Sequence, residues 1–493
     1  MSESRTQRLV RLDHAHVWHP FTPMKQWREQ PMLVIDRAEG EYLIDTEGNR
    51  YIDGVSSLWC NVHGHRVPAV DEAVREQLDK VAHTTLLGLG SPPSIELAAM
   101  LAERAPGNLN KVFYSDAGAT ALEVAFKMAV GYWHHRGKPG KQKFIGLAGA
   151  YHGDTTGSMS VGYSELFHRP FLSMVFPTTW FPNPDPCRPP AEAARAAAQA
   201  PQSPGMAMPG LHGGRHRWPS EDEQLAAALR DYCLGELDRM LDEQASDTAA
   251  IVIEPVMQGA AGMICQPAGF VKGVADLAKK HDVLLIADEV ATGFGRTGRL
   301  FAVEHDDVEP DLLCLAKGIT AGYLPLAATL ATDDVEQAFT GELADRRTLY
   351  HGHTYTGNPL ACAAAIASLE LFEQNDLLSH IEKSAAIIAE KLAPLRDAEA
   401  CPHVLDVRQR GLMVGIELCE DRTSARAFDF AAREGYAVCA AIRAKGVIVR
   451  PLGDVLILMP IPAMPHASLE RMLDAVVETL LSWRVPASDG ARG

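Results

Sequence analysis

The sequence is short of positive charge and lacks long apolar runs. Its 46 lysine and arginine residues are outnumbered by 63 aspartate and glutamate residues, which gives a formal net charge of −17. A nucleic acid or an anionic membrane surface is therefore not expected as a partner. No apolar run of about 18 residues is present, so no membrane span is predicted. Residues 1–25 mix Arg, Asp, His and Pro without an apolar core, so a secretory signal is not expected either.

Paired cysteines are also absent. Nine cysteines are scattered along the chain, and no two of them form a C-x-x-C pair. An odd, dispersed set argues against a disulfide framework and for a reducing cytoplasm. We expect cysteines such as Cys314 and Cys362 to fill the core. With 493 residues, 47% of them hydrophobic, the chain is long enough for a large core and two domains.

Two apolar runs that each end in a charged residue are the most informative feature present. Residues 283–287 (VLLIA) precede Asp288, and residues 312–316 (LLCLA) precede Lys317. Such runs are typical of strands buried on both faces of a parallel sheet. Open α/β sheets bind their ligands at the carboxyl ends of such strands. An acid and an amine at that edge fit pyridoxal phosphate (PLP), because a lysine amine bonds to its aldehyde and a carboxylate pairs with its protonated ring nitrogen.

Three other interpretations compete with this one. An aspartate and a lysine at strand ends can simply form a salt bridge. The string LLIADE is typical of the acidic strand of a P-loop ATPase, but the G-x-x-x-x-G-K-[ST] partner is absent from the sequence. Residues 293–298 (GFGRTG) match the dinucleotide pattern G-x-G-x-x-G. Residues 288–292 separate that motif from the strand, whereas a Rossmann strand runs straight into the first glycine, so we discount it.

Helical patterns alternate with short apolar runs in the middle of the chain, and this predicts an α/β fold with a mostly parallel sheet. We expect a large cofactor-binding domain over residues 66–345. A smaller α+β domain is expected from residues 1–65 and 346–485, with residues 486–493 as a tail. Residues 183–222 are rich in Pro, Ala, Gly and His and are expected to form a flexible surface loop.

Two polar turns precede predicted helices. Residues 115–120 (SDAGAT) lead into a helix that begins near Ala121. Free N–H groups at a helix N-terminus suit a phosphate, although an ordinary N-cap explains the same residues equally well. Residues 357–359 form the second turn, shortly after His351 and His353. These two histidines have no third ligand at a suitable spacing, so no metal site is expected.

Together these motifs resemble one family, the class III aminotransferases among the fold-type I PLP enzymes. The resemblance covers nearly the whole chain. The matching segments are residues 116–123, 151–154, 254–255, 287–290, 293–298, 317–318 and 354–359. Further segments are similar to the family members that act in biotin biosynthesis. They are residues 18–22 (WHPFT), 56–59 (SSLW), 63–64 (HG), 351–354 (HGHT) and 450–453 (RPLG).

The resemblance implies a homodimer with shared active sites and a role for each matching residue. Lys317 holds the cofactor and moves a proton between the substrate carbon and C4′. Asp288 keeps the ring nitrogen protonated, and Tyr151 lies along the ring and the substrate. The cofactor phosphate is bound by Gly118, Ala119, Thr120 and, from the neighbouring subunit, Thr354.

The resemblance also implies the substrates. The acceptor is 8-amino-7-oxononanoate, whose carboxylate Arg450 holds and whose alkyl chain lies against Trp59. Gly352 and His353 line the same shared pocket, with His353 beside the cofactor. Phe21 and Leu58 stand where members that use S-adenosylmethionine have a tyrosine and an aromatic residue.

Several alternatives stay open. The amino donor is S-adenosylmethionine or, as in some members, lysine. The main functional alternative is another class III ω-aminotransferase, acting on ornithine, 4-aminobutyrate or a diamine. A second alternative is a binding protein that keeps the cofactor without turnover, and the presence of both Lys317 and Asp288 argues against it.

Overall fold

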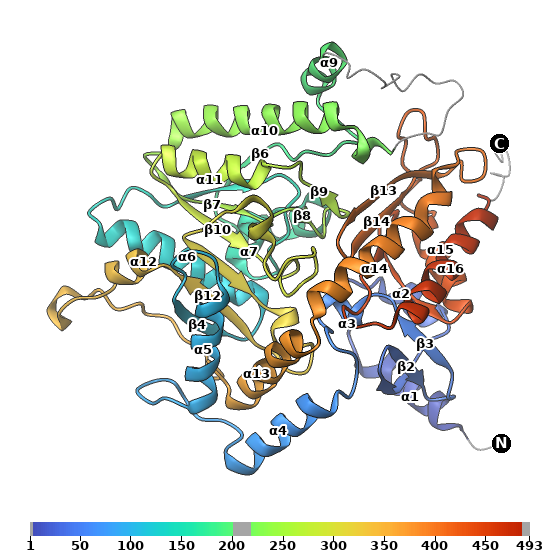
Figure 1. Ribbon diagram of the computed structural model, residues 1–493, viewed down its shortest axis with the longest axis horizontal. Helices are drawn as coiled ribbons and strands as arrows, with labels where there is room; N and C mark the ends of the chain where they lie inside the picture. Colours follow the sequence, from blue (N-terminus) through green and yellow to red (C-terminus); the bar gives the residue numbers. More distant parts are fainter. Residues whose placement is uncertain (1–2, 201–217, 486–493) are drawn as a thin grey trace.

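A computed structural model describes residues 3–200 and 218–485 of the chain (Figure 1). Its centre is a seven-stranded sheet in the order β4-β12-β11-β10-β7-β5-β6. The bounds of these strands are β4 Lys111–Ser115, β12 Ala327–Ala331, β11 Leu312–Leu315, β10 Leu284–Asp288, β7 Thr248–Ile253, β5 Lys143–Leu147 and β6 Thr179–Phe181. All neighbours are parallel except β12, which runs antiparallel to both β11 and β4. The predicted α/β fold with a mostly parallel sheet is confirmed.

Strand β10 shows why its apolar run is continuous. Successive side chains of a strand point to opposite faces. Leu285 and Ala287 pack into one hydrophobic cluster, whereas Leu284 and Ile286 pack into another. Both faces of the sheet are thus covered by helices, so every position of the strand is apolar until Asp288 ends it.

The helices on the two faces come from different parts of the chain. One face carries α5 (Pro92–Arg104), α10 (Glu223–Gln244), α11 (Phe270–Lys280) and α13 (Pro359–Gln374). The other carries α6 (Gly118–His135), α7 (Thr156–Val161) and α12 (Asp333–Ala338). Helix α4 (Pro68–Lys80) packs on α13.

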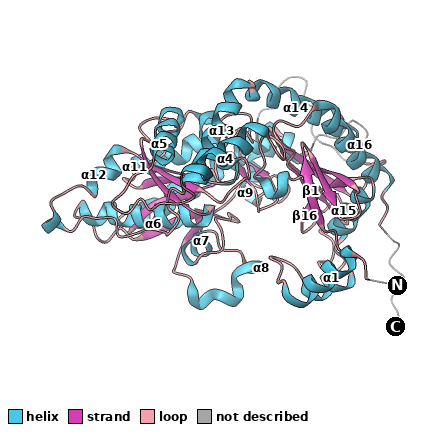
Figure 2. Cartoon of the chain, turned by 90° about the horizontal axis from the view of Figure 1, so that it is seen from below, coloured by secondary structure: helices cyan, strands magenta, loops and turns pink. Residues whose placement is uncertain are grey.

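A second body lies beside the first and is built from the first and last elements of the described chain (Figures 1 and 2). One of its sheets has the order β1-β2-β3-β15 and another the order β13-β14-β17-β16. The strand bounds are β1 Ile35–Glu39, β2 Tyr42–Asp45, β3 Arg50–Asp53, β15 Val447–Ile448, β13 Val404–Arg410, β14 Met413–Leu418, β17 Val455–Leu458 and β16 Arg450–Leu452. Because β15 pairs in parallel with β3, the two ends of the chain share a sheet.

Helices α14 (Leu377–Leu392), α15 (Glu434–Ala444) and α16 (His466–Ser482) contribute to the core of this second body. The remaining α-helices and strands are α1 Arg5–His16, α2 Met24–Glu29, α3 Ser56–Trp59, α8 Glu165–His168, α9 Ala191–Gln199, β8 Met257–Gln258 and β9 Ile264–Cys265. No helix of the described residues is long and apolar enough to cross a bilayer.

The prediction of a loop over residues 183–222 is wrong for part of its length. Residues 191–199 (AEAARAAAQ) form helix α9, because alanine has the highest helix propensity of all residues. Trp218 is only 2% exposed and belongs to the core of the second body. Residues 201–217 and the predicted tail 486–493 lie outside the described residues.

Candidate active site

Asp288 and Lys317 meet at the carboxyl edge of the central sheet. Strands β10 and β11 are parallel neighbours, with Asp288 in register with Cys314 and Lys317 three residues further on. Asp288 is 4% exposed and Lys317 is half-buried. Among the residues that the structure describes, Lys317 forms no ion pair, so the simple salt-bridge interpretation fails. Burial lowers the pKa of Lys317, while the carboxylates of Asp288 and Glu254 act in the opposite sense.

His152 is the direct partner of Asp288. Its Nδ1 lies 2.7 Å from Oδ2 of Asp288, and both side chains are buried. The other carboxylate oxygen of Asp288 accepts the N–H of Val290 at 3.0 Å. His152 Nε2 is buried and finds no hydrogen-bond partner within the described ranges.

Tyr151 and Glu254 lie beside this pair. Glu254 is 4% exposed and accepts the backbone N–H groups of Tyr151 at 3.1 Å and Gly259 at 2.9 Å. Burial raises the pKa of Glu254 to about 7. The hydroxyl of Tyr151 donates to Asp154 at 2.7 Å. Burial, and then the carboxylate of Asp154, raise the pKa of Tyr151.

The predicted phosphate turn reaches the same edge of the sheet. Helix α6 begins at Gly118, three residues after strand β4 ends. Gly118 packs closely against Val290, which follows Asp288 by two residues. A Cβ on Gly118 would lie only 2.5 Å from Cγ1 of Val290. Thr120 Oγ1 accepts the N–H of Ala117 at 3.0 Å and donates to its carbonyl at 2.7 Å. Thr120 is thus the third residue of the helix and bonds to the backbone of Ala117, which is the N-cap residue. An N-cap by the side chain of Ser115 or Asp116 is not formed. Gly118 and Ala119 lie partly exposed.

Trp59 lies against Lys317 from the other side. The Lys317 Nζ atom is 5.4 Å from the centroid of the indole ring, within range of a cation–π contact. A Cβ on Gly259 would lie 3.1 Å from Cζ3 of the ring, so a larger residue there would push the indole by a few tenths of an ångström. Leu58 is 52% exposed and Phe21 is 56% exposed. The Phe21 ring lies edge-on to Phe167, with centroids 5.6 Å apart.

Residues 56–59 adopt an uncommon backbone. Ser56, Ser57, Leu58 and Trp59 all have positive φ, at 48°, 50°, 81° and 70°. This is one turn of left-handed helix, closed by the Trp59 N–H to the Val55 carbonyl at 2.8 Å. A left-handed residue other than glycine costs roughly 1–2 kcal/mol. Strain of this kind persists only where surrounding contacts fix the conformation, and it clusters at functional sites.

Arg450 lies on the sheet face that Trp59 packs against. It pairs with Ile457 across strands β16 and β17, so their side chains share a face. Ile457 belongs to a methionine-rich cluster against which Leu452 and Trp59 pack. Arg450 is exposed, and its guanidinium has no hydrogen bond or ion pair with any described residue.

The segment with His351 and His353 lies beside the phosphate turn of its own chain. The two Nε2 atoms are 2.9 Å apart, and His353 Nδ1 lies 3.5 Å from Asp116 Oδ2. Gly352 and Thr354 are exposed, and no hydrogen bond holds the Thr354 hydroxyl to the described part of the chain.

Sequence comparison decides the family. The family described as aminotransferase class-III matches residues 24–480. The chain belongs to the class III aminotransferases.

Two relatives of this class III enzyme are named adenosylmethionine-8-amino-7-oxononanoate aminotransferase. The protein of Nitratidesulfovibrio vulgaris is 47% identical over 490 residues, which cover 99% of this chain and 84% of the relative. The protein of Geobacter sulfurreducens is 45% identical over 97% of this chain and 99% of the relative. A solved structure of the same name from Methanocaldococcus jannaschii has a TM-score of 0.85, 40% identity and 96% and 99% coverage. A PLP-bound amine transaminase from an uncultivated Pseudomonas species has a TM-score of 0.83 and 33% identity over 94% and 98% of the chains.

Class III aminotransferases depend on PLP, and the side chains at this edge fit that cofactor. The buried carboxylate of Asp288 lies at the same sheet edge as Lys317, which suits a protonated ring nitrogen. Three buried polar atoms at this edge of the sheet have no partner among the described residues. They are Ser115 Oγ, Asp116 Oδ1 and His152 Nε2. Unpaired buried polar atoms are costly, and a bound polar group satisfies them.

Sequence reasoning assigned no role to three residues of this class III site: His152, Glu254 and Arg296. All three lie in segments that match the family, which was the available signal. Arg296 is 1% exposed, and its guanidinium donates to Ser56 Oγ at 3.1 Å and to the carbonyls of Pro460 and Asn61 at 2.8 Å each. It belongs to the GFGRTG motif, which here forms turns between β10 and β11 rather than a strand–helix junction, so discounting the dinucleotide interpretation was right.

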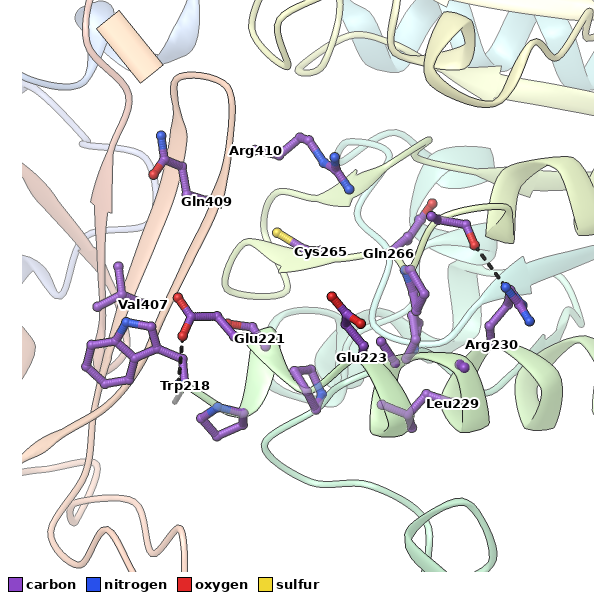
Figure 3. Close-up of a pocket in the computed structure, with 18 of the residues that line it drawn as sticks. Trp218, Glu221, Glu223, Leu229, Arg230, Cys265, Gln266, Val407, Gln409 and Arg410 are labelled. Atoms are coloured by element: carbon purple, nitrogen blue, oxygen red, sulfur yellow. Dashed lines mark hydrogen bonds between the residues drawn. The ribbon is translucent and has the colours of Figure 1, made fainter. Parts of the chain in front are cut away.

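A cavity of about 540 Å³ lies away from these residues, between the two bodies (Figure 3). Its walls include Glu223, Gln266 and Arg410, and none of the predicted site residues lines it. The Gln266 side chain bonds the Val256 N–H and the Glu254 carbonyl, so one wall of the cavity supports the loop that carries Glu254.

Proposed function

We propose that this class III aminotransferase transfers an amino group to 8-amino-7-oxononanoate and forms 7,8-diaminononanoate, a step of biotin biosynthesis. The observation that carries the proposal is the unpaired guanidinium of Arg450, on the sheet face that also carries the Trp59 wall. The acceptor has a carboxylate at the end of an alkyl chain, and a guanidinium fork next to an apolar surface suits both parts. The names of the relatives support the same substrate.

Bound PLP supplies an aldehyde that takes up the amino group and a ring that withdraws electrons from the substrate carbon. Asp288 holds a proton on the ring nitrogen by charge pairing, and His152 fixes the orientation of that carboxylate. Lys317 carries the proton to and from the substrate carbon. Its lowered pKa increases the fraction of neutral amine, which is the form that accepts a proton.

The phosphate of the cofactor is proposed to bind at Gly118, Ala119 and Thr120, where the α6 N-terminus offers N–H groups. Thr354 of the neighbouring subunit is proposed as a further ligand. In support, Thr354 is exposed, and its segment carries exposed apolar side chains as a dimer interface requires. Tyr350 and Tyr355 are 72% and 59% exposed. We therefore propose a homodimer with shared active sites.

S-adenosylmethionine is the proposed amino donor, as the names of the relatives suggest. Lysine is the second candidate, because Phe21 and Leu58 offer neither a hydroxyl nor an aromatic face for a sulfonium cation. We also propose that the enzyme acts in the cytoplasm, where its nine free cysteines stay reduced. The domain boundary at residue 65 remains part of this proposal. The boundary expected at residue 345 moves to the end of helix α13, because α13 packs in the core of the central sheet.

A panel of acceptors tests the proposal. The purified enzyme with PLP is incubated with each donor and with 8-amino-7-oxononanoate or the oxo forms that correspond to ornithine and 4-aminobutyrate. We expect amination of 8-amino-7-oxononanoate with a kcat/KM at least about 100-fold above the others. Equal or better turnover of the short acceptors, with none of 8-amino-7-oxononanoate, would replace the proposal by a general ω-aminotransferase.

A further inference from the structure

The left-handed turn of residues 56–59 contains no glycine, so neighbouring side chains must hold it. One buried carboxylate makes most of the contacts with its strained centre. Asp53 is fully buried, and its Oδ1 accepts the Ser57 N–H at 3.0 Å and the Val55 N–H at 3.4 Å. Its Oδ2 accepts the Ser57 hydroxyl at 2.7 Å and faces His65 Nε2 at 3.1 Å. These contacts fix Val55, just before the turn, and Ser57, within it, and they connect both to His65, which follows the turn in sequence.

The first residue of the turn, Ser56, is held by other groups. The Ser56 hydroxyl donates to the Met459 carbonyl at 2.6 Å and accepts from Arg296. Within the described residues, the Ser57 N–H and hydroxyl bond only to Asp53, while the Ser57 carbonyl accepts the Cys60 thiol at 3.5 Å. The middle of the turn, and with it the direction in which Leu58 and Trp59 leave the backbone, therefore depends on the Asp53 carboxylate.

We propose that Asp53 is a positioning residue for substrate specificity: by holding the left-handed turn, it sets Trp59 against Lys317 and directs Leu58 outwards. The inference rests on the proposed function, in which Trp59 forms the wall for the acceptor chain. Asp53 touches neither cofactor nor substrate and acts only through the turn. Loss of its contacts lets the turn relax toward a right-handed backbone, which rotates both side chains away from their places.

The test substitutes Asp53→Asn in the full-length enzyme with PLP. An amide retains one acceptor oxygen but cannot accept hydrogen bonds on both sides. We expect KM for 8-amino-7-oxononanoate to rise at least about ten-fold, with kcat within about three-fold, because uniform binding of the alkyl chain is lost. Ser57→Ala removes only the hydroxyl contact and should raise KM by about three-fold. The Ser57→Ala variant tests the proposal even if Asp53→Asn does not fold.

Asp45→Asn is the matched control. Asp45 is a buried carboxylate on the neighbouring strand β2, and it holds a different turn through Asn49 and Glu47. Its substitution should lower stability in the same way without changing KM. An equal rise of KM in both variants, or no rise in Asp53→Asn, would overturn the proposal.

A second readout does not depend on turnover. The difference between the near-UV circular dichroism spectra of the wild-type enzyme and Trp59→Phe gives the signal of the Trp59 indole in its native environment. We expect Asp53→Asn to lose the same signal and Asp45→Asn to keep it. If the wild-type enzyme does not aminate 8-amino-7-oxononanoate, the proposed function fails, while this signal still decides the role of Asp53. Retention of the Trp59 signal in folded Asp53→Asn would refute that role.

Discussion

Substitution of Arg450 by alanine should weaken binding of the acceptor and leave the fold unchanged. The guanidinium is exposed and makes no hydrogen bond or ion pair within residues 3–200 and 218–485. Its removal therefore breaks no internal contact, and we expect a change in the free energy of unfolding within about 0.5 kcal/mol. All of the effect should appear in substrate binding.

The size of that effect follows from the exposure of the site. A hydrogen bond to a charged group contributes about 1.5–3 kcal/mol, and a forked guanidinium–carboxylate pair makes two. Arg450 is solvent-accessible, so screening reduces the sum, and we expect a loss of about 2–3 kcal/mol. This corresponds to a rise in KM for 8-amino-7-oxononanoate of roughly 30- to 150-fold. Arg450→Lys retains the charge without the fork and should give a rise of about ten-fold.

Steady-state kinetics with varied acceptor at saturating donor measure this change. Arg195→Ala, which removes an exposed arginine from helix α9, is the control for a general loss of positive charge. The reasoning is wrong if Arg450→Ala binds the acceptor normally and loses only donor affinity, or if its unfolding transition shifts as much as its KM.

Four further results are expected. Lys317→Ala should abolish turnover and covalent retention of the cofactor, and covalent tagging by borohydride in this variant would point to another lysine. Asp288→Asn should fold but lose at least about 100-fold in kcat, since an amide cannot hold the ring proton by charge pairing, and near-wild-type turnover would give Asp288 another role. A heterodimer of Lys317→Ala with Thr354→Ala protomers should regain one working site, whereas no rescue in a verified heterodimer would place each site within one chain. Glu254, with its native pKa of about 7 above the ordinary 4.5, binds its proton more tightly in the folded state, so its contribution to stability is full below pH 4.5 and is lost as pH rises through 7. In urea titrations of the cofactor-free protein, the free energy of unfolding should therefore fall by roughly 3 kcal/mol between pH 4.5 and 7, and Glu254→Gln should remove this fall. An unchanged pH profile in the variant would contradict the raised pKa.

The sheet edge and its two charged residues were predictable because the signal is local. An apolar run that ends in one charged residue specifies both the buried strand and the place of its last side chain, as for Asp288 and Lys317. Helix α9 also had a local signal, its run of alanines, and the composition of the surrounding segment concealed it.

Partners far apart in sequence could not be predicted in this way. His152 meets Asp288 across 136 residues, and Arg296 bonds the Pro460 carbonyl across 164. The left-handed turn had no signal at all, because Ser57 and its neighbours are not the residues that favour positive φ. Its conformation follows from tertiary contacts such as that of Ser56 with Met459, 403 residues away.

The most direct test of the central claim follows the transferred nitrogen. The enzyme with PLP is incubated with 8-amino-7-oxononanoate and with either lysine or S-adenosylmethionine carrying ¹⁵N at its amino groups, and the product is analysed by mass spectrometry. Transfer of one ¹⁵N into 7,8-diaminononanoate is predicted, with S-adenosylmethionine as the better donor. Labelled product from lysine alone would reverse the proposed order of donors. No labelled diamine from either donor, in enzyme that still exchanges amino groups with ω-amines, would contradict the assigned acceptor.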